Sequence, residues 1–170
     1  YRNTQSKASF QNQDLPAYEY FEKQVQELVE YLNTFTDVPV KGFPFLSARG
    51  CPFACTYCGH LYGSKFVRKN WEPWFDHVEH LITKYNVPGF YNHDTNMFLR
   101  PDEIDMYCKI YEERKCDFKM VAELRPTFGN YEMYEKLYKH GVEVSTFGFE
   151  SGSEEMLSRM KRPMQKMDQT

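Results

Sequence analysis

The sequence lacks the features that mark membrane-spanning, secreted and nucleic-acid-binding chains. Its 170 residues contain no apolar run long enough for a transmembrane helix, which needs about 20 residues. It does not start with the charged segment and apolar core of a secretory signal. Lysine and arginine number 21 against 24 aspartates and glutamates, so a strongly basic surface is not expected. We therefore expect a cytoplasmic protein with neither a nucleic-acid partner nor a membrane span.

The chain is also too short for a closed eight-stranded α/β barrel, which takes about 250 residues. It has room for one ordinary domain. Aromatic residues are abundant at 17% of the chain, and burying so many rings offsets the entropy lost on folding. A folded domain is therefore expected rather than a disordered chain. Because the first residue is Tyr1 and not Met, we expect the chain to be a piece of a longer protein.

The sequence divides into a short N-terminal region and a larger core. Residues 1–38 are predicted to be a polar linker and an amphipathic helix that begins near Asp14 to Pro16. Val25, Leu28, Val29 and Leu32 form the apolar stripe of that helix. Residues 39–170 are predicted to form the core domain.

Short apolar runs alternate with helical stripes through the core. The predicted strands cover residues 43–48, 89–93, 118–124 and 142–149. The helices that follow are expected to begin at Pro73, Pro101, near Tyr131, and at Ser151, which forms a capping-box pattern with Glu154. Repeated strand–helix units imply parallel strands joined by right-handed crossovers. The predicted fold class is α/β: a partial (β/α) TIM-type barrel of about four βα units, preceded by an N-terminal helix.

Cysteines are few and unevenly placed, with five in the chain and three of them within eight residues. An odd number argues against a full disulfide framework, whereas Cys51, Cys55 and Cys58 together indicate a metal site. Zinc would need a fourth ligand, which His60 could supply, but no second cysteine pair follows. A four-iron cluster held by three cysteines would leave one iron open, and this interpretation is favoured.

The segment Cys51-Pro-Phe-Ala-Cys55-Thr-Tyr-Cys58 resembles the signature of the radical SAM superfamily, C-x3-C-x-aromatic-C after the first barrel strand. The resemblance implies that these cysteines bind a 4Fe–4S cluster and that S-adenosylmethionine chelates its open iron. It implies reductive cleavage to a 5′-deoxyadenosyl radical that attacks a small-molecule substrate. An external electron donor such as flavodoxin or ferredoxin is implied as a partner. Tyr57 is expected near the adenine.

Polar residues follow the later predicted strands, at the edge where parallel α/β folds bind ligands. By the resemblance, they would contact S-adenosylmethionine: its amino group, its carboxylate (Arg125) and its ribose hydroxyls. These residues also have structural alternatives. Asp94 to Asn96 could form a turn, Glu123 and Arg125 an ion pair, and Ser151 a helix cap. The predicted cofactor-binding set is Tyr57, Asp94, Thr95, Asn96, Glu123, Arg125, Glu150 and Ser151. No catalytic residue is identified.

The stretch from Phe147 to Arg162 and the Asp94-Thr95-Asn96 cluster resemble the cobalamin-dependent branch of the superfamily. That resemblance implies methyl transfer, or C–C bond or ring formation, on an unactivated carbon. Cobalamin would come through a domain absent from this chain. The alternative from another class is a zinc-stabilised interaction module that uses Cys51, Cys55, Cys58 and His60. A basic patch, Lys65, Arg68 and Lys69, is either a solvated face or a contact for an anionic substrate or the cobalamin domain.

Overall fold

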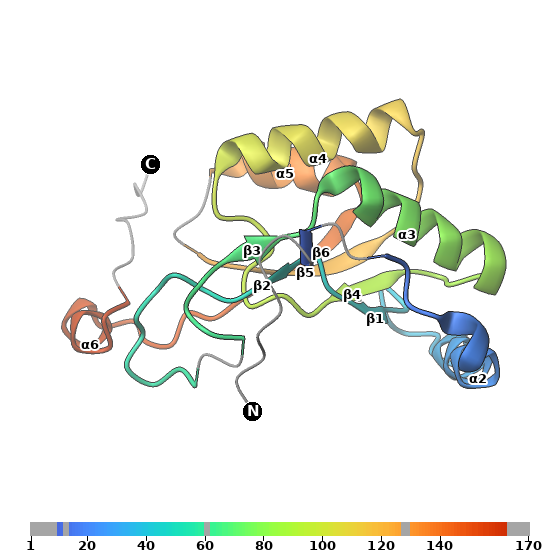
Figure 1. The fold of residues 1–170 in the computed structure, drawn as a ribbon. Helices are drawn as coiled ribbons and strands as arrows, with labels where there is room; N and C mark the ends of the chain where they lie inside the picture. The colour runs from blue at the N-terminus through green and yellow to red at the C-terminus, as the bar shows by residue number, and fades with distance from the viewer. Residues whose placement is uncertain (1–9, 12–13, 60–61, 127–129, 163–170) are drawn as a thin grey trace.

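A four-stranded parallel sheet forms the centre of the computed structural model, which describes residues 10–11, 14–59, 62–126 and 130–162. The strands lie in the order β1-β4-β5-β6, and each neighbouring pair is parallel. Their bounds are β1 Phe43–Phe45, β4 Phe90–Asn92, β5 Met120–Leu124 and β6 Val142–Phe147. Helices alternate with these strands along the chain, so the structure confirms the predicted α/β fold with its partial barrel (Figure 1).

One face of the sheet is covered by the helices α3 Trp71–Tyr85, α4 Pro101–Glu113 and α5 Tyr131–Lys139 (Figure 1). The aromatic residues that the composition singled out pack between this face and the helices. Trp74, Phe75 and Tyr107 are fully buried there, and the Trp74 and Phe75 rings meet edge to face with centroids 5.0 Å apart. Burial of large rings in this geometry contributes strongly to the stability of the fold.

The starts of the helices agree with local sequence signals, with two corrections. The α3 helix begins at Trp71, two residues before the predicted start at Pro73. Pro101 occupies the first turn of α4, where its missing N–H costs nothing. The final helix, α6 Glu154–Arg159, is capped by Ser153, whose Oγ accepts a hydrogen bond from the Met156 N–H at 3.3 Å. The prediction of Ser151 as the cap was therefore wrong by two residues, since its Oγ instead accepts from the Ser153 N–H.

The N-terminal helix begins later than the sequence suggested. A 3₁₀ turn, η1 Tyr18–Tyr20, precedes α2 Glu22–Asn33, so Asp14 to Pro16 lie outside the helix. The predicted apolar stripe is confirmed, because Val25, Val29 and Leu32 are buried in the main core while Leu28 packs against it. The α2 helix contacts both α3 and the edge strand β1.

The predicted first strand is divided into two short strands that belong to different sheets. After β1 the chain turns into β2 Ala48–Arg49, which pairs antiparallel with β3 Val67–Arg68. The segment between these two strands contains all three clustered cysteines. The β2–β3 pair therefore closes the base of the cysteine loop beside the carboxyl ends of the main strands.

Among the described residues, no helix combines the length and the apolar character needed to cross a bilayer.

Candidate functional site

The cysteine loop is fixed at its base by a glycine that no other residue could replace without strain. Gly50 has a φ of +78°, and a Cβ at this position would lie 2.1 Å from the Lys65 carbonyl oxygen. Next to it, the Cys51 N–H donates to the Gly63 carbonyl oxygen at 3.1 Å. Farther along the loop, the Thr56 N–H donates to the Met160 carbonyl oxygen at 3.0 Å. The loop is thus anchored both to its own return segment and to the chain after α6.

One cavity of about 180 Å³ joins this loop to the carboxyl ends of three main-sheet strands. Nine of the eleven residues predicted for the cluster and S-adenosylmethionine line it, whereas Asp94 and Ser151 do not. The nine are Cys51, Cys55, Tyr57, Cys58, Thr95, Asn96, Glu123, Arg125 and Glu150. Four further residues line the cavity without being in the predicted cofactor-binding set: Phe53, Leu124, Gly148 and Arg162.

The three cysteines form no disulfide and lie on the cavity wall, with Cys55 buried and Cys51 and Cys58 half-buried. Within the described part of the chain, no three His, Cys, Asp or Glu side chains converge on a point that could hold a single metal ion. Three thiols on one wall are the donors that three irons of a four-iron cluster require, because each cysteine binds a different iron. His60 of the zinc alternative lies outside the described residues.

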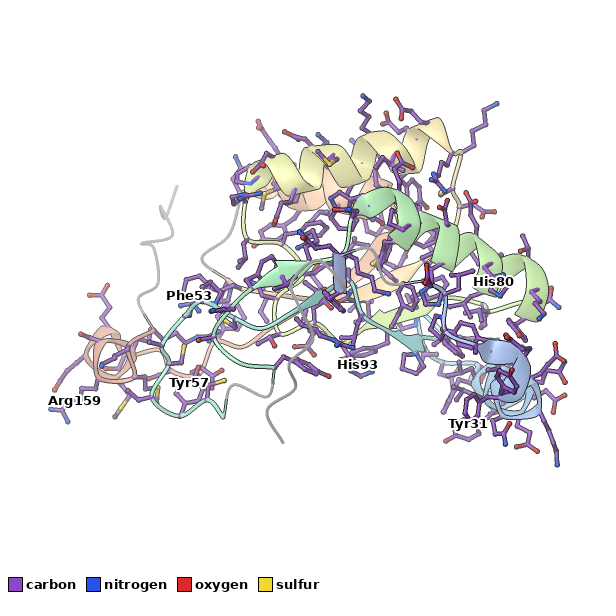
Figure 2. All side chains as sticks on the ribbon, viewed as in Figure 1. Tyr31, Phe53, Tyr57, His80, His93 and Arg159 are labelled. Atoms are coloured by element: carbon purple, nitrogen blue, oxygen red, sulfur yellow. The ribbon has the colours of Figure 1, made fainter. Side chains whose placement is uncertain are left out.

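Arg162 carries positive charge to the cysteine loop from the segment after α6. Its Nη1 lies 3.9 Å from the Cys55 Sγ and donates to the Tyr57 hydroxyl at 3.0 Å, while Nη2 donates to the Gly148 carbonyl oxygen. Burial raises the pKa of Tyr57 although Arg162 opposes the shift, so the phenol stays protonated near neutral pH. Figure 2 shows Phe53 and Tyr57 at the α6 end of the molecule, far from Tyr31 on α2. Arg162 ends the stretch that carries the family resemblance, but nothing in the sequence indicated that its side chain reaches the cysteine loop.

The polar cluster after β4 is divided between a structural role and the cavity. Asp94 is buried, and its Oδ1 accepts from the backbone N–H groups of Ser47 and Ala48 at 2.8 and 2.9 Å, while Oδ2 accepts from the Ser47 hydroxyl. Burial raises the pKa of Asp94 against the opposing effect of these hydrogen bonds. This carboxyl ties the start of β2 to the end of β4.

Asn96 lies on the cavity wall, and its side-chain oxygen is available to accept a hydrogen bond from a ligand. The side chain is 3% exposed, and its Oδ1 has no hydrogen-bond partner among the described residues. A buried acceptor without a partner costs about 1–3 kcal/mol, and a bound donor would remove that cost. Such an orphaned oxygen fits an ammonium group such as the α-amino group of an amino acid.

Two charged residues stand at alternate positions at the end of β5 and share one side of the strand. The Glu123 Oε1 accepts from the Tyr91 hydroxyl at 3.4 Å. The Arg125 guanidinium is 7% exposed and lies 3.8 Å from the centroid of the Phe53 ring, in a cation–π contact. Phe53 thus links the cysteine loop to the end of β5.

After β6, Gly148 and Glu150 line the cavity, and the backbone at both positions is constrained. A Cβ on Gly148 would lie 2.7 Å from the Glu150 Oε1, so glycine makes room for this carboxylate. Glu150 itself has a φ of +62°, a backbone conformation that residues other than glycine rarely adopt. Strained backbone of this kind is concentrated at functional sites.

A family model described as "Radical SAM superfamily" matches residues 45–169, which include the cysteine loop, the strands β4 to β6 and the residues that line the cavity. The chain therefore belongs to the radical SAM superfamily, as its cysteine motif indicated.

Two similar solved structures are of TsrM from Kitasatospora setae, a radical S-adenosylmethionine methyltransferase. One contains tryptophan substrate and the analogue aza-SAM; it superposes with a TM-score of 0.62 at 18% identity and covers 69% of this chain. The other contains cobalamin and a [4Fe-4S] cluster, with a TM-score of 0.63 at 17% identity and 72% coverage. The chain spans only 23% of the TsrM length, so the likeness establishes the fold. No curated protein matches the chain in sequence.

Proposed function

We propose that this chain is the part of a radical SAM enzyme that holds a 4Fe–4S cluster and S-adenosylmethionine for reductive cleavage to the 5′-deoxyadenosyl radical. The observation that carries the proposal is the one cavity that Cys51, Cys55 and Cys58 share with the polar ends of β4, β5 and β6. Superfamily membership supports it independently.

Cys51, Cys55 and Cys58 would hold the cluster. When bound and reduced, such a cluster supplies an electron to the sulfonium of S-adenosylmethionine. Arg162 lies beside the Cys55 Sγ, and a cation there favours the thiolate that metal binding requires. Gly50 and the contact of Thr56 with Met160 hold the loop so that all three thiols stay on one wall.

The strand ends would bind and orient S-adenosylmethionine. The Asn96 Oδ1 would accept from its α-amino group, and Arg125 would donate to its carboxylate in a charge-assisted pair. Glu123 and Glu150 would accept hydrogen bonds from the ribose hydroxyls. Phe53 holds the Arg125 guanidinium by its ring face, which reduces the orientational freedom that binding must remove.

The remaining predicted contacts have weaker structural support. Thr95 lines the cavity, and Tyr57 lines it beside the cysteines, where adenine stacking would use its half-exposed ring. Asp94 would act as a positioning residue through its hydrogen bonds to the start of β2. Ser151 would act through the turn before α6, where it contacts Ser153.

We further propose methyl transfer, or C–C bond or ring formation, on an unactivated carbon of a small molecule. The stretch from Phe147 to Arg162 supports this assignment, as does the fold shared with TsrM, a methyltransferase with a cobalamin-bound structure. Cobalamin would be held by a region outside this chain, and electrons would come from a flavodoxin or ferredoxin. Residues 39–170 would form the radical SAM core, with residues 1–38 as an N-terminal addition.

The test is S-adenosylmethionine cleavage by the full-length protein that carries this chain. After anaerobic reconstitution with iron and sulfide, the protein receives dithionite and S-adenosylmethionine, and 5′-deoxyadenosine is quantified by mass spectrometry. We expect 5′-deoxyadenosine from the reconstituted protein and none from Cys55→Ala. A protein that contains the intact cluster but forms no 5′-deoxyadenosine would contradict the proposal.

A further inference from the structure

A second cavity, of about 390 Å³, lies at the carboxyl ends of β1 and β4 and shares no lining residue with the cysteine cavity. Its walls contain both apolar and charged side chains. Tyr18, Phe45 and Leu46 contribute apolar surface, whereas Arg49 and Lys69 contribute positive charge. None of its described lining residues is an aspartate or a glutamate. The cavity therefore combines an apolar body with a cationic end.

Lys69 is the unusual member of this wall. The residue is only 9% exposed, and its backbone N–H is held by the Ser47 carbonyl oxygen at 2.8 Å. Its Nζ lies 5.8 Å from the centroid of the Phe10 ring, and the Arg49 guanidinium lies 4.5 Å from the same centroid. In the described part of the chain, no carboxylate forms an ion pair with Lys69. Two cations thus meet over one aromatic ring.

The neighbouring Arg68 shows how this protein treats a buried cation that serves structure alone. Its Nε lies 3.3 Å from Glu103, and it also donates to the Ser47 hydroxyl at 3.1 Å. Arg68 is therefore compensated inside the protein, although it directly precedes Lys69. The basic patch predicted from the sequence is divided: Arg68 belongs to a structural ion pair, Lys65 is exposed, and Lys69 faces the second cavity.

None of the other described titratable groups around the cavity forms an ion pair with Lys69. Burial lowers the pKa of His77 to about 3, and its Nε2 is 2.7 Å from the Tyr18 hydroxyl, so this imidazole is neutral near pH 7. Burial and the nearby Arg49 lower the pKa of Lys69, while Asp94 opposes that shift from a distance. The Asp94 carboxylate is already occupied by Ser47 and Ala48. Burying a cation without a counter-charge is costly, and a bound anion would remove that cost.

We propose that this second cavity binds an organic carboxylate, with the carboxylate between Lys69 and Arg49 and an apolar or aromatic body against Phe45, Leu46 and Tyr18. The ammonium and the guanidinium can each donate hydrogen bonds to one of the two oxygens of a carboxylate. Binding requires neither the cluster nor S-adenosylmethionine. The cavity lies at the same edge of the sheet as the cysteine site. An organic carboxylate bound here would therefore be the substrate of the enzyme, a role that rests on the proposed function.

The test compares three probes of the same shape on the purified full-length protein by isothermal titration calorimetry. The probes are 1-naphthoate, the neutral 1-naphthamide and 1-naphthyl phosphate. We expect 1-naphthoate to bind at least about tenfold more tightly than the amide, since a charged hydrogen bond contributes about 1.5–3 kcal/mol. Equal binding of acid and amide would overturn the proposal. Tighter binding of the phosphate would overturn the assignment to a carboxylate.

Lys69→Met tests the cationic wall while it preserves the length of the side chain. It should weaken 1-naphthoate binding about tenfold and leave 1-naphthamide binding unchanged, whereas Lys69→Arg should retain most of the affinity. The matched control is Lys65→Met, which removes an exposed lysine four residues earlier in the chain and should change nothing. Unchanged 1-naphthoate affinity in Lys69→Met would contradict the proposal.

A second readout remains valid even if Lys69→Met does not fold. Reductive methylation of the unmodified protein, followed by peptide mass spectrometry, reports the accessibility of each lysine. We expect 1-naphthoate to slow methylation of Lys69 and to leave Lys65 unaffected. Equal labelling of Lys69 with and without the probe would count against the site. Because this assay does not involve S-adenosylmethionine cleavage, its failure is distinct from failure of the proposed function.

Discussion

The helix-covered face of the sheet and the carboxyl edge of its strands differ in how completely their side chains are satisfied. Beneath the helices, Trp74, Phe90 and Met120 are almost wholly buried and surrounded by other apolar groups. At the carboxyl edge, Asn96 retains an acceptor without a partner among the described residues, and Lys69 is a buried cation without a carboxylate there. The helix-covered face stabilises the fold. The carboxyl edge contains buried polar groups whose energetic cost a bound ligand would remove.

A single strand shows both kinds of environment. In β5, Met120 and Ala122 are fully buried, whereas Glu123 is half-buried and contacts Tyr91 across the sheet. Successive side chains of a strand point to opposite faces, so one strand of five residues can serve the core and the cavity together. The comparison predicts that core substitutions change stability and that edge substitutions change ligand binding.

The largest effect on stability is expected from Trp74→Ala, because the side chain is 0% exposed and in contact with several other rings. Truncation of a buried tryptophan costs about 3–5 kcal/mol in the free energy of unfolding. Urea denaturation monitored by circular dichroism measures this loss. Tyr131→Ala is the control, since Tyr131 is 78% exposed and should change stability by less than about 0.5 kcal/mol. Similar losses for both variants would contradict the contrast between core and surface.

At the edge, Arg125→Gln is expected to reduce S-adenosylmethionine affinity about 10- to 100-fold, which corresponds to the about 1.5–3 kcal/mol of a charged hydrogen bond. The measurement is equilibrium binding to the cluster-loaded protein. Arg159→Gln is a matched control, because Arg159 lies on the exposed surface of α6 and pairs with Glu155. If Arg125→Gln lowered stability and left affinity unchanged, Arg125 would be a structural cation.

The free energy of unfolding should decrease as the pH falls from about 6.5 to about 3, because burial lowers the pKa of His77 from 6.5 to about 3. The unfolded chain binds a proton over this interval and the folded protein does not, so acid favours unfolding. A single group of this kind contributes at most about 1.4 kcal/mol per pH unit. Urea denaturation across this interval measures the slope. His77→Gln should flatten it, and an unchanged slope in that variant would contradict the assignment to His77.

The smallest loss of stability is expected from Asn96→Ala. The Asn96 Oδ1 has no partner among the described residues, and a buried acceptor in that state costs about 1–3 kcal/mol, so its removal should not lower the free energy of unfolding. The same substitution should reduce S-adenosylmethionine affinity several-fold. Parallel urea denaturation and binding measurements separate the two effects. A large loss of stability with unchanged affinity would show that Asn96 belongs to the scaffold.

The sequence predicted the features with a strong local signal. Apolar runs and helical stripes are repeated over many residues, so the parallel strands, α3 to α5 and the Val25, Val29 and Leu32 stripe could be identified. The C-x3-C-x-aromatic-C spacing marked the cysteine wall of the cavity.

Features that depend on tertiary contacts were not predictable. The strands β2 and β3 have two residues each, too few for any periodicity, and their position depends on Asp94 contacts 46 and 47 residues away. Arg162 reaches Cys55 across 107 positions of sequence. The adjacent Arg68 and Lys69 looked equivalent, yet one meets Glu103 and the other faces a cavity. In each case the environment comes from a distant segment.

The central claim is that Cys51, Cys55 and Cys58 hold a 4Fe–4S cluster, and metal analysis of the anaerobically reconstituted protein tests it most directly. Iron, sulfide and zinc are quantified per chain, with electron paramagnetic resonance of the reduced protein. We predict about four irons and four sulfides per chain for the unmodified protein, the Cys116→Ala control and His60→Ala, and loss of the cluster in Cys55→Ala. One zinc per chain without sulfide, lost in His60→Ala, would contradict the account.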